Sequence, residues 1–215
     1  GWFMHGADWI GPTKTMHNVK FPYKNDLIIP VFISTCLSPD CPELFEEESI
    51  EYLKANSPVF CRDKTTMEML EEKGVDVEFS GCITATLDIE NVPDNPDYEK
   101  EFAGRTLFVH GDDLFRFQNV IPDKQPLIIN QYIQELKNIS PKERIDAAGD
   151  LLSQYKYADK IYTTRLHCLL PARAMGLKVE FITADGKDCY RTKDLLEGSK
   201  EKEELKTKFY EVIGQ

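Results

Sequence analysis

The stretch of sequence that decides the fold is ADKIYTTRLHCLLPARAMGLKVEFI, which occupies residues 158–182. Within it, residues 160–164 are β-prone, residues 168–175 suit an apolar helix, and residues 179–182 resemble a buried strand. We expect Gly176 to end the helix, and we expect the helix to tolerate Pro171 because it falls in the first turn. A strand, a helix and a strand in this order predict a parallel sheet with a crossover helix.

Three residues of this stretch, Arg165, Leu166 and His167, lie where the first strand ends and the helix begins. Ligands of open α/β sheets collect at the carboxyl ends of strands, and the first turn of a helix offers N–H groups to an anion. The guanidinium of Arg165 fits phosphate or carboxylate, and the imidazole of His167 can exchange a proton near neutral pH. The alternative is that Arg165 pairs with a nearby acid and His167 is a packed structural residue. The junction position favours a binding site.

A second block of sequence repeats this pattern earlier in the chain. It reads SPVFCRD at residues 57–63, continues through a predicted helix that ends in KGVD at 73–76, and finishes with FSGCITATL at 79–87. This block places Arg62 at a strand end just before a helix. Together with RLHC at 165–168 and the AxAMG that follows, it resembles the polysaccharide pyruvyl transferase family, in the same order and over most of residues 27–196.

The resemblance implies an α/β fold of Rossmann-like parallel sheets with flanking helices, arranged in two halves that face across a cleft as in GT-B glycosyltransferases. The N-terminal half would be shortened, because a further α/β section usual at the start of family members has no counterpart here. The polar stretch 88–101 is the best candidate boundary. We therefore expect an abbreviated α/β half at 1–100 and a Rossmann-like half at 101–215, which carries the Arg-Leu-His turn.

The resemblance also implies an activity, the transfer of pyruvate from phosphoenolpyruvate to a sugar of a surface polysaccharide precursor as a ketal. His167 would be the general acid/base, and Arg165 and Arg62 would hold the phosphate and carboxylate of the donor. Leu166 and Arg191 would add substrate contacts, and no cofactor is implied. A local pair for Arg62 and a surface position for Arg191 stay open. So do two other functions, a GT-B-like glycosyltransferase using a nucleotide sugar and a non-catalytic member that binds a glycan or an anion.

The composition of the chain argues against several other classes of protein. A net charge of −11 argues against general nucleic-acid binding, which requires a basic surface. The sequence contains no apolar run long enough for a transmembrane helix and no visible signal peptide. Six cysteines are too sparse for a disulfide scaffold and lack the spacing of a zinc site, so we expect free thiols, which fit a reducing, cytoplasmic setting. Neither a P-loop nor a Gly-x-Gly-x-x-Gly motif is present.

Hydrophobic patterning predicts the remaining elements. We expect strands at 27–34 (distorted at Pro30), 58–61, 75–79, 83–87, 106–110 and 126–131, and helices at 42–56, 64–73, 141–155, 168–176 and 200–213. Asp63 is a candidate N-cap, and Ser140 with Glu143 has the spacing of a capping box. The pair Asp112 and Asp113 could suggest a metal site, but adjacent acids after a glycine more often cap a short helix, here at 113–117.

Overall fold

Parallel strands flanked by helices form both parts of the chain in the computed structural model, which describes residues 2–3, 8–9, 19–20, 27, 29–39, 41–122, 125–131, 140–182 and 202–214. The chain divides into two compact units. Unit 1 comprises Gly1–Ile83 and Cys189–Gln215, and unit 2 comprises Thr84–Asp188. The α/β class and the Rossmann-like parallel sheets agree with the prediction.

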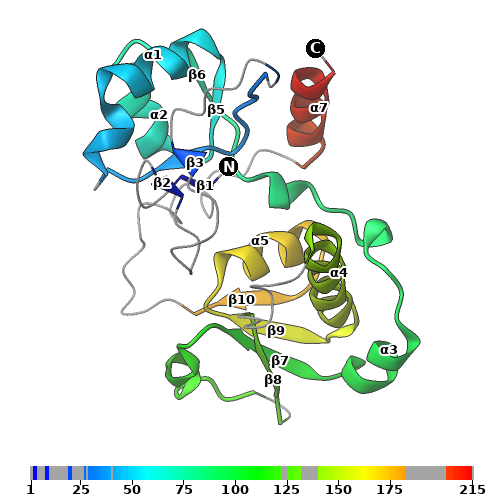
Figure 1. The fold of residues 1–215 in the computed structure, drawn as a ribbon. Coiled ribbons are helices and arrows are strands. Elements are labelled where there is room, and N and C mark those ends of the chain that lie inside the picture. The colour runs from blue at the N-terminus through cyan, green and yellow to red at the C-terminus, as the bar shows by residue number, and fades with distance from the viewer. Residues whose placement is uncertain are drawn as a thin grey trace. The chain divides into compact units, whose positions relative to one another are not determined.

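Unit 2 is built on one parallel sheet with the strand order β10-β9-β7-β8 (Figure 1). Its elements are η2 (Ile83–Thr86, beginning at the unit boundary), η3 (Ile89–Asn91), α3 (Pro96–Phe102), β7 (Thr106–His110), η4 (Leu114–Phe117), β8 (Leu127–Asn130), α4 (Pro141–Tyr157), β9 (Lys160–Thr163), α5 (Leu166–Ala174) and β10 (Val179–Phe181). Side chains alternate between the faces of a strand. Leu107, Val109 and Ile161 therefore pack on α4 and α5, while Phe108 stacks on Phe117 of η4 on the other face.

The β9–α5–β10 unit confirms the predicted strand, helix and strand, and Gly176 follows the helix with a left-handed φ of 76°. The predicted helix start was wrong. α5 begins at Leu166, because the carbonyl of Arg165 already accepts from the amides of Cys168 and Leu169, both at 3.0 Å. Pro171 consequently lies inside the helix and not in its first turn.

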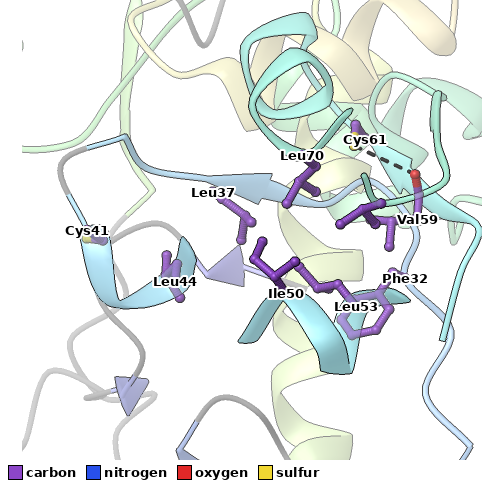
Figure 2. Packing of buried hydrophobic residues seen from close by; sticks show 10 residues of the cluster. Phe32, Leu37, Cys41, Leu44, Ile50, Leu53, Val59, Cys61 and Leu70 are labelled. Atoms are coloured by element: carbon purple, nitrogen blue, oxygen red, sulfur yellow. Dashed lines mark hydrogen bonds between the residues drawn. The ribbon is translucent and has the colours of Figure 1, made fainter. Parts of the chain in front are cut away.

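Unit 1 contains β1 (Trp2–Phe3), β2 (Asp8–Trp9), β3 (Val19–Lys20), β4 (Cys36–Leu37), η1 (Pro42–Phe45), α1 (Glu47–Ala55), β5 (Val59–Cys61), α2 (Lys64–Glu71), β6 (Val77–Phe79) and α7 (Lys202–Ile213). β1 pairs with β4, and β5 with β6, in parallel; β2 and β3 are antiparallel. Figure 2 shows the core, in which Leu37, Leu53 and Leu70 are fully buried. Leu205 and Phe209 of the predicted C-terminal helix are buried.

The predicted strand at 27–34 was wrong. Leu27 and Ile29 are 94% and 89% exposed. Downstream of them, the amide of Phe60 donates to the carbonyl of Phe32, and the amide of Thr35 donates to the carbonyl of Phe60. Two residues, 33 and 34, therefore lie opposite Phe60, where a regular parallel ladder has one. This is a β-bulge, and Ser34 within it has a φ of 54°. The distortion expected at Pro30 lies a few residues later.

Two further predictions need correction. Residues 83–87 do not form a strand, because η2 begins at Ile83, whose amide donates to Oγ of Ser34 at 2.8 Å. The helix predicted at 42–56 is divided into η1 and α1, since Glu46 has an extended backbone with ψ of 158°.

The helix caps predicted at Asp63 and at Ser140 are present. Oδ1 of Asp63 accepts the amide of Thr66 at 2.8 Å, which caps α2, and Ser140 with Glu143 forms a complete capping box at the start of α4. No helix in the described part of the chain is long and apolar enough to cross a bilayer.

Candidate functional site

The turn between β9 and α5 is held in place by a hydroxyl of the sheet. The amide of Arg165 donates to Oγ1 of Thr163 at 3.0 Å, and the same hydroxyl donates to the carbonyl of Val109 at 2.9 Å. Arg165 is the N-cap residue of α5 and is half-buried, whereas His167, in the first turn, is exposed. The predicted pair therefore occupies the carboxyl end of the sheet, with the imidazole accessible.

The guanidinium of Arg165 lies against Gly111, which directly follows β7. A Cβ on Gly111 would collide with Nη2, Cζ and Nε of Arg165. The end of the arginine side chain thus fills the space that any other residue at 111 would need. This contact brings together two strand ends, those of β7 and β9, that pair in parallel along their length.

Asp113 links the same two loops. Its Oδ1 accepts the amide of Gly111 at 3.1 Å and the hydroxyl of Thr164 at 2.9 Å, and its Oδ2 lies 3.5 Å from Nε of Arg116. Partial burial raises the pKa of this carboxyl, but the two hydrogen bonds and the charges of Arg165 and Arg116 outweigh it, so the net pKa is below its ordinary value. The carboxylate is therefore ionised near neutral pH.

The expectation that Asp113 caps a helix is only partly right. Asp113 occupies the N-cap position of η4, but its side chain makes no capping hydrogen bond and bonds to the neighbouring turn. Within the described ranges, no group of three or more histidines, cysteines or acids is placed to hold a metal ion.

His110, the last residue of β7, is a candidate that the sequence reasoning missed. Its side chain is 8% exposed, and its Nδ1 is buried with no hydrogen-bond partner in the structure as described. Buried polar atoms are normally paired, so an unpaired one calls for an explanation such as a catalytic role or a bound water or ion. The available signal was a histidine at the end of a predicted strand, directly before the Gly-Asp-Asp run.

Cys168, within the Arg-Leu-His-Cys motif, is structural. Burial raises the pKa of its thiol to about 12, which outweighs hydrogen bonds with Thr163 and Tyr155. Tyr155 is itself buried on α4, and its hydroxyl accepts from Nε2 of Gln131 at 3.1 Å. A thiol with such a pKa stays protonated at neutral pH and is not a nucleophile.

Unit 1 has its own strand end, at β5. Arg62 follows β5 with 3% exposure, and its amide donates to the carbonyl of Thr35 at 2.7 Å. Oδ2 of Asp63 and Oγ1 of Thr35 are buried there without hydrogen-bond partners among the described residues. Arg62 and Arg165 belong to different units, so a joint clamp stays a prediction, and Arg191 lies outside the described residues.

One comparison with known proteins gives a match. A family model described as polysaccharide pyruvyl transferase matches residues 5–183, which is most of the chain and includes the strand ends of both units. No curated protein and no solved structure matches the chain.

Proposed function

The chain belongs to the polysaccharide pyruvyl transferase family, and we propose that it transfers pyruvate from phosphoenolpyruvate to a sugar of a surface polysaccharide precursor, forming a ketal. Membership of the family implies a transferase with a sugar or glycan acceptor. The proposal adds the donor, the ketal product and the residues that act on them.

The observation that carries the proposal is the Arg165–His167 turn at the start of α5. A guanidinium lies at the carboxyl end of a parallel sheet and at the N-terminus of a helix, where negative charge is favoured, and an exposed imidazole follows two residues later. In a chain with a net charge of −11, such a local cation supports binding of an anionic donor. Phosphoenolpyruvate carries a phosphate and a carboxylate, both of which fit an arginine fork.

The reaction requires a general acid that protonates the methylene carbon of phosphoenolpyruvate. In the proposed reaction, His167 protonates this carbon, and one sugar hydroxyl attacks the adjacent carbon, which has become electron-poor. The C–O bond to phosphate then breaks, inorganic phosphate leaves with the bonding electrons, and a second hydroxyl of the same sugar closes the ketal. Both hydroxyl protons are released, and one of them restores His167.

The arginines would bind and stabilise the negative charges of the donor. Arg165 would bind an anionic group of the donor and stabilise the phosphate as it departs, because a fixed cation at a developing charge lowers the barrier. Arg62 and Arg191 are proposed as further donor contacts, and Leu166 as an apolar one. The GT-B-like arrangement of two halves that would bring Arg62 to the same donor is part of this proposal.

The test begins with the donor. Calorimetry with phosphoenolpyruvate, and in parallel with a nucleotide sugar, should give binding of phosphoenolpyruvate only. A panel of aryl glycosides with free hydroxyl pairs is then incubated with phosphoenolpyruvate. Phosphate release should depend on the glycoside, and the product mass should increase by that of pyruvic acid less water. Binding of the nucleotide sugar alone would replace the proposal with the glycosyltransferase reading, and binding without turnover on any acceptor would favour a non-catalytic member.

A further inference from the structure

The glycine at position 111 is not required by its backbone. Gly176 has a φ of 76°, a conformation that side-chain-bearing residues rarely adopt, and Gly111 is not among the residues with positive φ. Alanine could therefore take the same main-chain conformation at 111. The requirement for glycine must come from the space around it.

That space is occupied by Arg165. The three atoms nearest to a Cβ at Gly111 are Nη2, Cζ and Nε of Arg165. They form the far end of a flexible side chain and not a piece of main chain. An added methyl group would therefore displace the guanidinium and leave the backbone and the core in place.

The two loops cannot easily separate to avoid this conflict. Oδ1 of Asp113 accepts from Gly111 in one loop and from Thr164 in the other. The amide of Thr164 also donates to the carbonyl of Val109 at 3.3 Å. Gly111 and Arg165 are thus held together by bonds on both sides of their contact.

We propose that Gly111 is a positioning residue for the anion-binding site of Arg165. Its missing side chain lets the guanidinium rest across the end of β7, where the donor anion would be bound. This inference rests on the proposed function only for the identity of the anion, because the placement of Arg165 can be tested without any ligand.

The experiment compares the parent protein with Gly111→Ala, Arg165→Ala and the double variant. Gly149→Ala is the matched control, since a Cβ on Gly149 of α4 meets Cγ of Pro93 at an ordinary 3.7 Å. The Nε–Hε resonance of Arg165, assigned by its loss in Arg165→Ala, reports the position of the guanidinium without ligand. Calorimetry with phosphoenolpyruvate and with inorganic phosphate reports affinity, and thermal unfolding reports stability.

We expect Gly111→Ala to fold, to shift the Arg165 resonance, and to lose about tenfold or more in affinity for phosphoenolpyruvate, the scale of one hydrogen bond to a charged group. The double variant should bind no more weakly than Arg165→Ala, because Gly111 acts through the arginine. Gly149→Ala should match the parent in both resonance and affinity. If Gly111→Ala instead unfolds, restoration of the fold in the double variant would also support the inference, since it removes the atoms in conflict.

An unchanged resonance and unchanged affinity in Gly111→Ala would overturn the inference. So would an equal loss of affinity from Gly111→Ala with and without Arg165, or unfolding that the double variant does not correct. If the parent binds neither phosphoenolpyruvate nor phosphate, the proposed function fails. The resonance then still decides the role of Gly111.

Discussion

Asp113→Ala should loosen the carboxyl end of the unit 2 sheet, because this carboxylate joins the loop after β7 to the turn after β9. The substitution removes the acceptor for the amide of Gly111 and for the hydroxyl of Thr164. A hydrogen bond to a charged group contributes about 1.5–3 kcal/mol. The two bonds share one oxygen on a side chain that is 15% exposed, so we expect a total loss of about 2–3 kcal/mol and not the sum of two full bonds.

The assay must report on unit 2. Both tryptophans of the chain, Trp2 and Trp9, belong to unit 1. Urea unfolding is therefore followed by hydrogen exchange in peptides that cover β7 and β9. The control is Asp112→Ala, which removes an exposed acid one residue away and should change stability by no more than about 0.5 kcal/mol. Thr164→Val completes a double-mutant cycle with Asp113→Ala.

The stability that Asp113 contributes should fall as the pH becomes acidic. The pKa of Asp113 is lowered in the folded chain, so its charged form contributes stability that is present above the unfolded pKa and is lost as the pH falls through the folded one. The stability difference between the parent and Asp113→Asn should therefore shrink on acidification below about pH 4, the usual range of an aspartate. Equal losses in Asp112→Ala and Asp113→Ala, or no coupling between Asp113 and Thr164, would refute the reasoning.

Three other outcomes are expected. His167→Ala should lower turnover, measured as phosphate release, about 10²–10⁴-fold while its affinity for phosphoenolpyruvate, measured by calorimetry, persists. Arg165→Ala should weaken that affinity by about 1.5–3 kcal/mol, and Arg165→Lys should not restore it. Leu53→Ala, in a fully buried position of unit 1, should cost about 2–5 kcal/mol in urea unfolding followed by tryptophan fluorescence; a loss below about 1 kcal/mol would contradict the core assignment. The thiols of Cys61 and Cys168, with pKa raised by burial to about 12, should react with a thiol reagent only after unfolding. Because these thiols ionise more easily in the unfolded chain, the free energy of unfolding should fall as the pH rises above about 9. Fast labelling of the native chain would show that the two thiols are not buried.

The sequence predicted most of the unit 2 sheet because the signals there are local. Four apolar runs became β7, β8, β9 and β10, and the capping box at Ser140 and the stop at Gly176 were confirmed. Caps and strand propensity depend on residues a few positions apart, so they can be read along the chain. The Arg-Leu-His turn was predicted at the correct junction for the same reason.

The incorrect strand predictions, at 27–34 and at 83–87, share a different cause. Apolar composition alone did not distinguish the exposed residues Leu27 and Ile29 from a strand, because pairing with a distant strand decides which part of an apolar run is extended and covered; Phe32, further along the same run, is bonded to Phe60. Ile83 begins a 3₁₀ turn, and its amide bonds to the side chain of Ser34, which is far away in the sequence. Such partners are invisible to patterns of period two or 3.6.

The sequence by itself determined the α/β class, the family and the type of residue at each strand end. Only the tertiary structure decided which of those residues meet. Parallel pairing sets the ends of β7 and β9 side by side, and this is why Arg165 lies against Gly111 and why Asp113 bonds to Thr164. Nothing in either loop alone specifies these contacts, because they arise from strands that are distant in sequence and adjacent in the sheet.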